Sequence, residues 1–331
     1  MSAEHKNNIP VLDSLRAFAA LSVCLFHYVC TTTGFIQGEG VKDLFSIGIY
    51  GVQLFFVISG FVIPWAMYNA GFRFSNFFRF LFKRLLRLEP PYIVSVLLAL
   101  FILYAKEKFF GMQTGGDLSY QRILLHLGYL IPFFEQYEWL NTVYWTLAVE
   151  FQYYLLIALL FIPLIRMGLM FRVFVYAGII AASFIGGKPF LPYWLPVFML
   201  GILLFLFKSK RIADKEYYIV SVLMFGFCAY KYELASLVYI IIPVIAVLYF
   251  SQYKIKGLHF LGKTSYSIYL IHPLIGGTFI NILSHSVHHP LMKAALILAG
   301  VIITLVSAYI MYLLVEKPSK KLSASISYKL S

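Results

Sequence analysis

Long apolar runs, separated by short charged or Gly/Pro-rich breaks, fill most of this 331-residue sequence. About 20 mostly apolar helical residues cross the roughly 30 Å hydrocarbon core of a bilayer, so runs of this length predict transmembrane helices. The pattern gives ten such runs, near residues 11–31, 47–70, 90–105, 143–164, 172–187, 192–208, 217–231, 234–251, 264–283 and 291–315. We therefore predict an all-α fold, a polytopic membrane helix bundle of about ten transmembrane helices.

Composition supports lipid as the surrounding solvent. Hydrophobic residues make up 61% of the chain and charged residues 12%, whereas a soluble domain carries about 25% charged residues. The chain is too short for ten spans plus a sizeable soluble domain, so we predict one membrane-embedded domain over residues 1–331 and no fused extracytoplasmic domain. The longest external connection is 106–142. Its apolar run at 121–134 is too short to cross alone, which favours an interfacial or re-entrant helix over an outward-facing site.

The net charge of +13 is distributed in short clusters between apolar runs. No single basic stripe is present, so we expect no nucleic-acid partner. With a cytoplasmic N-terminus, 20 of the 27 Lys and Arg residues lie on the inner side, as the positive-inside rule favours. This bias predicts cytoplasmic N- and C-termini in a multi-pass plasma (inner) membrane protein. Cys24, Cys30 and Cys228 have no CxxC spacing, so we expect no metal and no disulfide framework.

Among the ionisable residues of the predicted spans, three qualify best as functional candidates: His27, Glu150 and His272. Such residues are energetically costly in a membrane and are functional candidates by default. Arg16 precedes His27 by eleven residues, which is about three helical turns and about 16 Å along the axis. Both side chains therefore lie near one helix face, where an anion held at Arg16 could extend a long, narrow body to His27. The alternative is a packing histidine with a snorkelling arginine at the membrane edge.

Glu150 lies among polar and aromatic residues that include Trp145 and Tyr153. This surrounding is typical of a pocket wall, in which Glu150 would orient an imidazole or bind a hydroxyl-bearing substrate. A structural hydrogen bond between helices is the alternative. His272 lies in a hydroxyl-rich span directly before Pro273, which predicts a kink and a freed backbone carbonyl near this residue. A catalytic role and helix packing both remain open for His272.

A basic segment precedes the third predicted span. It carries Arg79, Lys83, Arg84 and Arg87 shortly before a Pro-Pro break. Arg84 and Arg87 are three residues apart and project from one helix face. The planar arginine fork suits phosphate oxygens, although a segment of this kind also contacts anionic lipid headgroups. Together with Arg16, the pair could hold a polyphosphate ligand.

These motifs together resemble the acyltransferase-3 family of integral membrane acyltransferases. The resemblance rests on the order and spacing of six segments: Arg16-x10-His27, GVQLFFVISGFVI (51–63), Arg84-x-x-Arg87-x-x-Pro90, YWTLAVEFQYY with Thr146 where serine is commoner, TSYSIYLIH, and the terminal YLLVEKPSKKL.

The resemblance implies an enzyme that moves an acyl group, commonly acetyl, from cytoplasmic acyl-CoA to a hydroxyl of an extracytoplasmic glycan. It also implies ten spans and makes His27 the expected catalytic residue. Arg16, Arg84 and Arg87 would bind acyl-CoA, and Glu150 would assist His27. Trp145, Tyr153 and His272 are the expected substrate contacts.

Two other functions compete with acyl transfer. A transporter or flippase for a polar solute or lipid-linked glycan also explains intramembrane His and Glu residues, but it leaves the basic segment beside the Arg16-x10-His27 spacing without a role. No internal repeat is visible, which argues against a transporter built from inverted halves. A non-catalytic scaffold or sensor with an acyltransferase-like core is the third hypothesis.

Overall fold

The computed structural model describes residues 9–31, 35–111 and 119–328. Helices form almost all of its regular structure, and no strand occurs within those ranges. The α-helices are α1 (Val11–Phe26), α2 (Glu39–Ser46), α3 (Gly51–Asn69), α4 (Phe77–Phe110), α5 (Tyr120–Leu127), α6 (Trp145–Arg166), α7 (Leu169–Ala182), α8 (Leu191–Lys208), α9 (Asp214–Lys231), α10 (Leu234–Tyr249), α11 (Lys256–Lys263), α12 (Ser265–Ile271), α13 (Thr278–Ser284), α14 (Pro290–Met311) and α15 (Lys317–Ser325).

Seven helical stretches in the described part of the chain have the length and apolar composition needed to cross a bilayer. Two shorter apolar helices, Leu169–Ala182 and Leu234–Tyr249, lie beside them. The predicted class, a polytopic membrane helix bundle, is therefore confirmed. The count of ten spans and the cytoplasmic position of both termini stay predictions, and two of the basic residues used for orientation, Lys6 and Lys329, lie outside the described residues.

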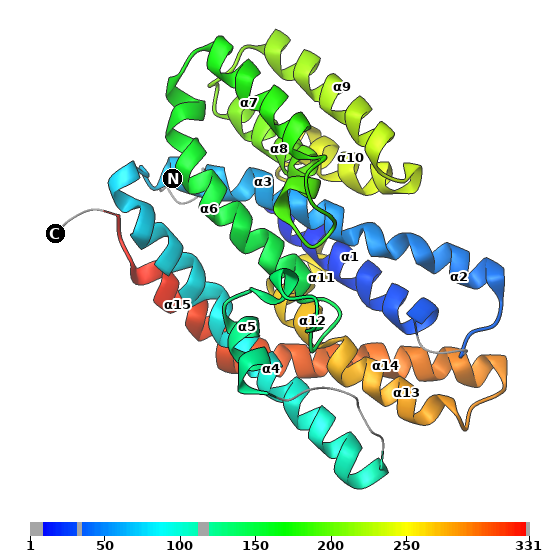
Figure 1. Cartoon of the computed structure of the whole chain (residues 1–331). Coiled ribbons are helices and arrows are strands. Elements are labelled where there is room, and N and C mark those ends of the chain that lie inside the picture. The colour runs from blue at the N-terminus through cyan, green and yellow to red at the C-terminus, as the bar shows by residue number, and fades with distance from the viewer. Residues whose placement is uncertain (1–8, 32–34, 112–118, 329–331) are drawn as a thin grey trace.

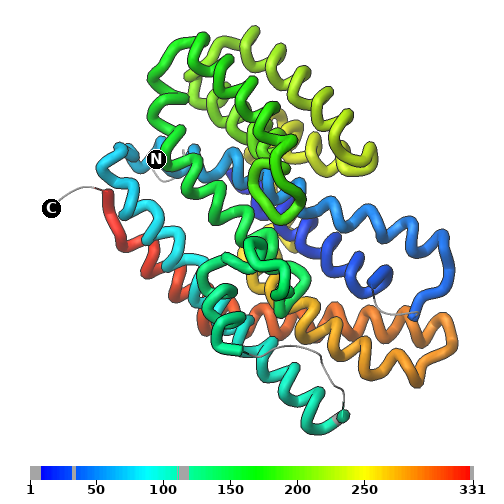
Figure 2. Tube along the Cα trace, in the orientation of Figure 1, coloured from blue at the N-terminus to red at the C-terminus, as the bar shows by residue number. Residues whose placement is uncertain are grey.

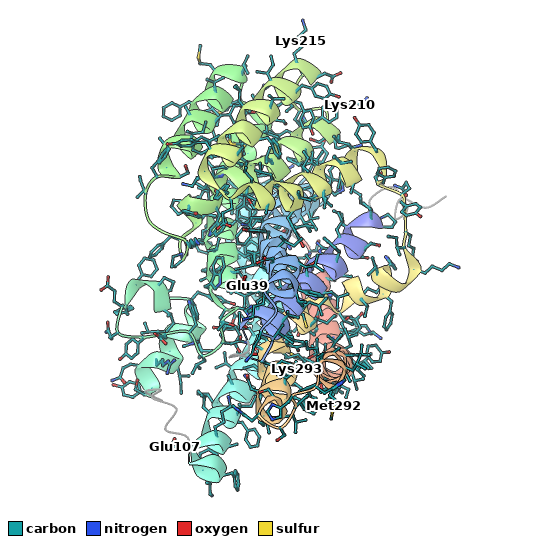
Figure 3. All side chains as sticks on the ribbon, turned by 90° about the vertical axis from the view of Figure 1, so that its right-hand side faces the viewer. Glu39, Glu107, Lys210, Lys215, Met292 and Lys293 are labelled. Atoms are coloured by element: carbon teal, nitrogen blue, oxygen red, sulfur yellow. The ribbon has the colours of Figure 1, made fainter. Side chains whose placement is uncertain are left out.

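The helices form two packed groups. In Figure 1, α1, α3, α4, α6, α14 and α15 run across the molecule, while α7, α8, α9 and α10 gather above them. The tube in Figure 2 shows α15, in red, packed alongside the first part of α4, in cyan. Figure 3 shows Lys210 and Lys215 at the upper end and Glu107 at the lower end. The predicted alternation of spans places these residues on opposite sides of the membrane.

A close crossing of α3 and α8 joins the two groups. A side chain at Gly60 would meet the Phe198 carbonyl oxygen at 2.2 Å, and one at Gly201 would meet the Val57 carbonyl oxygen at 2.2 Å. Small residues let membrane helices approach backbone to backbone, where packing replaces the hydrophobic effect as the attraction. This crossing fixes α3, which carries Phe55 and Ser59 toward the centre of the bundle.

The expected break at the Pro-Pro pair is wrong. Helix α4 runs without interruption through Pro90 and Pro91, so the basic segment and the third span form one helix. Proline removes a backbone donor and crowds the preceding turn. Membrane helices tolerate this where neighbouring side chains supply hydrogen bonds. The two prolines leave the carbonyls of Leu86 and Arg87 without their helical N–H donors, and the Tyr266 hydroxyl donates to the next carbonyl along the helix, that of Leu88, at 3.0 Å.

Three π-helical turns interrupt the bundle. They cover His27–Thr31, Pro273–Gly277 and Tyr312–Glu316. The second of these turns begins at Pro273, the residue at which the sequence predicts a kink; the kink itself stays a prediction. Single π turns widen a helix locally and occur frequently at functional sites. All three begin or end at a polar residue or directly beside one, namely His27, His272 and Glu316.

Candidate active site

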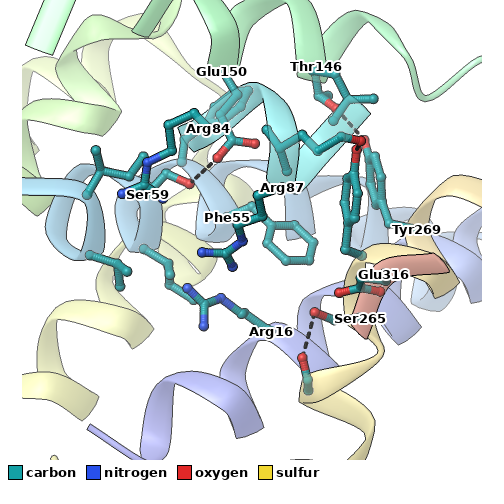
Figure 4. A pocket seen from close by; sticks show the side chains of 18 of the residues that line it. Arg16, Phe55, Ser59, Arg84, Arg87, Thr146, Glu150, Ser265, Tyr269 and Glu316 are labelled. Atoms are coloured by element: carbon teal, nitrogen blue, oxygen red, sulfur yellow. Dashed lines mark hydrogen bonds between the residues drawn. The ribbon is translucent and has the colours of Figure 1, made fainter. Parts of the chain in front are cut away.

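A cavity of about 240 Å³ lies between α1, α3, α4, α6, α12 and α15. Its lining combines apolar side chains with five basic and three acidic residues. The basic residues are Arg16, Arg84, Arg87, Lys263 and Lys320, and the acidic residues are Asp13, Glu150 and Glu316. Figure 4 shows the guanidinium groups of Arg16, Arg84 and Arg87 converging at one end, with Thr146 and Tyr269 at the other. One end of the cavity is therefore basic, and the other carries Thr146, Tyr269 and the carboxylate of Glu316.

Arg84 and Arg87 are half-buried in this cavity. The Arg84 guanidinium lies over the rings of Phe80 and Tyr154, at 5.4 Å and 5.6 Å from their centroids. Among the described residues, neither arginine has an anionic partner within ion-pair distance. Buried charges are normally paired, so two arginine side chains without a carboxylate partner favour binding of an anion from outside the protein.

Apart from Lys263, which is exposed, the other charged groups in the cavity have partners within the protein. Asp13 lies 3.4 Å from Arg16 and 3.3 Å from the ring of His259. Glu316 is fully buried and lies 2.5 Å from Lys320. These pairs leave the Arg84–Arg87 end as the part of the lining with unpaired positive charge.

Glu150 faces the cavity from α6. Its Oε1 accepts hydrogen bonds from the Ser59 hydroxyl at 3.1 Å and from the Tyr154 hydroxyl at 2.7 Å. Two hydroxyl donors hold this carboxylate in place beside the arginines. The sequence suggested that Glu150 could orient the His27 imidazole, but its hydrogen-bonding contacts are instead with α3 and α6.

His27 and His272 lie outside the cavity lining and next to each other. Their ring centroids are 5.2 Å apart. Tyr269 connects the cavity to this pair, because its ring lines the cavity and lies 6.0 Å from the ring of His272. The Tyr269 hydroxyl forms a 2.8 Å hydrogen bond with the Thr146 hydroxyl, and Phe55 packs edge-on against its ring at 5.7 Å.

The long connection between α4 and α6, on the predicted outer side, is bound to α4, because the Tyr92 hydroxyl donates to the His126 carbonyl at 3.0 Å. Arg122 donates from Nε and Nη2 to the Glu138 carbonyl at 3.0 Å and 2.8 Å. His126 is fully buried, and its Nε2 accepts from the Leu140 backbone N–H at 2.9 Å. Burial lowers the pKa of His126 to about 4, which keeps this ring neutral. Part of the predicted interfacial segment is thus the helix α5, tied to the loop that follows it; residues 112–118 of the same connection lie outside the described residues.

Trp145 and Tyr153 lie in aromatic packing and do not line the cavity. The Trp145 ring stacks on Trp194 at 5.7 Å, and the Tyr153 ring stacks on Phe198 at 4.2 Å. Their roles as substrate contacts stay predictions. On the same helix, the residues that face the cavity are Thr146, Leu147, Glu150 and Tyr154.

Sequence reasoning did not single out Tyr269, Ser59, Glu316 or Lys320 as site residues. A signal for Glu316 was present, because it is an ionisable residue directly after the last predicted span, 291–315, and Lys320 follows it by one helical turn. No comparable signal marks Tyr269 or Ser59. Across the described ranges, no three His, Cys, Asp or Glu side chains gather as a metal site requires.

Comparison with known proteins adds independent information. The profile of an acyltransferase domain family matches residues 9–313. The O-acetyltransferase OatA of Staphylococcus aureus is 26% identical over 95% of this chain and 57% of its own length, so the chain spans little more than half of this relative. ORF330 of Acidianus two-tailed virus, provisionally named an acetyltransferase, is 28% identical over 82% of this chain and 84% of its own length. The acyltransferase MdmB of Streptomyces mycarofaciens is 28% identical over 44% of this chain and 38% of its own length. No solved structure matches.

Proposed function

The chain belongs to the acyltransferase-3 family, and from this we propose that it moves an acyl group, by default acetyl, from acyl-CoA to a hydroxyl of an extracytoplasmic glycan. The observation that carries the proposal is the cavity lined by Arg16, Arg84 and Arg87. Of these, Arg84 and Arg87 have no anionic partner among the described residues. The name of the relative OatA supports O-acetylation.

Arginine is suited to this donor because its planar fork binds phosphate oxygens in a bidentate manner. In the proposed complex, Arg84 and Arg87 bind the phosphates of CoA, with Arg16 opposite them. The apolar part of the cavity, with Phe55 and Leu147, receives the uncharged arm of the donor. The thioester would then lie toward Tyr269 and the histidines beyond it.

His27 is the proposed base for the reaction. Its neutral imidazole takes the proton of the acceptor hydroxyl as the oxygen forms a bond with the acyl carbon. The carbon–sulfur bond breaks, and the CoA thiolate receives the proton from the imidazolium. Glu150, held by Ser59 and Tyr154, is proposed to position the polar part of the donor. With a plasma-membrane location, the donor would enter from the cytoplasm and the acceptor from outside.

The test of the donor site is binding of acetyl-CoA to the purified protein in detergent. A hydrogen bond to a charged group contributes about 1.5–3 kcal/mol, so Arg84→Ala with Arg87→Ala should weaken binding by at least about 100-fold. Arg79 is the matched control, because it lies on the same helix but is exposed and outside the cavity. Arg79→Ala should bind like the wild type. Unchanged binding in the double variant would return these arginines to lipid contact.

The test of chemistry is transfer of label from radiolabelled acetyl-CoA to a cell-envelope glycan extract. Transfer by the wild type that falls to a low residual rate in His27→Ala supports the enzyme. Movement of a glycan or solute across vesicles, with no label transfer, supports the transporter instead. An unchanged cellular phenotype in stably folded His27→Ala would favour the scaffold hypothesis. Mass spectrometry of envelope glycans from cells with and without the protein identifies the acceptor.

A further inference from the structure

A buried nitrogen of His272 has no hydrogen-bond partner in the described part of the chain. His272 is fully buried, and its Nε2 is unpaired. The ring beside it is that of His27, with centroids 5.2 Å apart and planes inclined by 45°. An unpaired buried polar atom is unfavourable and uncommon in folded proteins. The position of this atom beside the proposed base suggests that it has a role in the reaction.

The backbone fixes which nitrogen of His272 carries the proton. Its Nδ1 lies 3.1 Å from the Ile268 carbonyl oxygen. A carbonyl oxygen can only accept, so this contact assigns the hydrogen to Nδ1. In the neutral ring, Nε2 is then an acceptor with a free lone pair. His272 therefore presents a lone pair, and no proton, at its unpaired atom.

The residues around the pair hold it in a defined geometry. The Tyr28 hydroxyl donates to the His272 carbonyl at 2.8 Å, and the Gly277 backbone N–H donates to the same oxygen at 2.8 Å. Tyr28 also forms a 2.5 Å hydrogen bond with the Thr304 hydroxyl. Tyr28 directly follows His27 in the chain, so this buried network holds the backbone next to His27, while Nδ1 of the His27 ring lies 3.4 Å from the Thr31 hydroxyl oxygen. Functional groups held by buried neighbours in this way are pre-organised.

Two of the π turns lie at the histidine pair. One begins at His27 and the other directly after His272. A side chain at Gly276, within the second turn, would overlap the Tyr28 hydroxyl, so glycine is required for this close approach. A histidine used for packing alone needs neither a widened turn on each helix nor an unpaired ring nitrogen.

We propose that His272 positions His27 for acyl transfer by accepting a hydrogen bond at Nε2 from a ring N–H of His27. This inference rests on the proposed function. When His27 takes the acceptor proton, it becomes an imidazolium with N–H groups on both nitrogens, and one of them donates to His272. The proton then passes from His27 to the CoA thiolate. His272 keeps its own Nδ1 hydrogen throughout, so it is a positioning residue.

The test compares His272→Gln with His272→Leu. Glutamine can place an acceptor oxygen near the former Nε2, whereas leucine fills similar space without an acceptor. Partners that orient a functional histidine typically contribute about 10- to 100-fold. In label transfer from radiolabelled acetyl-CoA to the glycan extract, His272→Leu should lower kcat by about 100-fold. KM for acetyl-CoA should stay within about twofold, because the cavity is unchanged, and His272→Gln should recover activity to within about fivefold of the wild type.

A double variant separates positioning from a general structural defect. Residues that act as one unit are non-additive, so His27→Ala with His272→Leu should be no slower than His27→Ala alone. Three results overturn the proposal: wild-type kcat in His272→Leu, an equal loss in His272→Gln and His272→Leu, or multiplied losses in the double variant.

A milder variant covers the case in which His272 variants do not fold in detergent. Tyr28→Phe keeps the ring and removes the hydroxyl that holds the His272 carbonyl. It should lower kcat by about tenfold with KM unchanged, and wild-type kcat in this variant overturns the proposal. Absence of label transfer by the wild type overturns the proposed function, and this inference with it. Transfer by the wild type that His272→Leu leaves unchanged overturns the inference alone.

Discussion

Acidification should destabilise the connection between α4 and α6, which contains α5, because it protonates His126. His126 is fully buried. Its Nδ1 donates to the Arg122 carbonyl at 2.8 Å, and its Nε2 accepts from the Leu140 backbone N–H at 2.9 Å. A neutral ring can make both hydrogen bonds. A protonated ring carries hydrogen on both nitrogens, so it can no longer accept from Leu140.

The size of the effect follows from the pKa of His126. Burial lowers it to about 4, compared with about 6.5 for an exposed histidine. Because the folded form disfavours the proton, the stabilisation is complete above about pH 6.5 and is lost as the pH falls toward about 4. The full difference is about 3 kcal/mol. At pH 5 the loss is about 2 kcal/mol, which raises the opening constant of this segment by about 30-fold.

Hydrogen exchange measured by mass spectrometry tests this prediction. The readout is the peptide that contains the Leu140 amide, compared at pH 7.5 and pH 5 after correction for the intrinsic pH dependence of exchange. The wild type should lose about 30-fold of its protection at this peptide. His126→Gln retains an acceptor for Leu140 but cannot titrate, so its protection should not depend on pH. Constant protection in the wild type, or an equal loss in His126→Gln, would refute the reasoning.

Two further predictions concern packing around the site. Gly276→Ala should lower stability by about 1–3 kcal/mol and reduce transfer activity, because the added methyl group displaces the Tyr28 hydroxyl. The control is Gly226→Ala, because nothing lies within 4 Å of a side chain added there. Its unfolding temperature in detergent should equal that of the wild type or be slightly higher. Glu316→Ala should lower stability by about 3 kcal/mol, because it removes one partner of a buried ion pair. The value is at the low end of the usual range because the other partner, Lys320, is 33% exposed. An unfolding temperature equal to that of the wild type would show that the pair contributes nothing.

The apolar pattern predicted the class of fold well and some boundaries poorly. The predicted span at 90–105 lies inside a helix of 34 residues, Phe77–Phe110. An apolar run marks the part of a helix that lipid surrounds. It does not mark the ends of the helix where these extend beyond the lipid. The Pro-Pro pair reinforced the error, because rules for proline describe an isolated helix. The hydrogen bond from Tyr266 to Leu88 comes from a distant part of the chain, so local sequence could not reveal it.

The charged part of the site was predictable for a different reason. Arg16, Arg84, Arg87 and Glu150 are ionisable residues in or beside apolar runs, and such residues turn toward the interior of a bundle. The structure brings all four to one cavity. Which residue stands beside His27 was not predictable. That depends on how each helix is rotated about its own axis. From the sequence, Glu150 was the residue expected to orient an imidazole, and His272 was given no position relative to His27.

Helix α12 explains how one arrangement can serve both the cavity and the histidine pair. Its residues Tyr266 and Tyr269 line the cavity, and His272 follows Tyr269 by three positions, so the helical repeat directs them to one side. The rotation of α12 therefore sets the direction of the cavity wall and of the His272 ring together. Glu316 fixes that rotation, because it accepts hydrogen bonds from the Ser267 backbone N–H at 3.2 Å and from the Ser267 hydroxyl at 2.5 Å. A buried carboxylate far along the chain thus couples the proposed donor site to the proposed base through one helix.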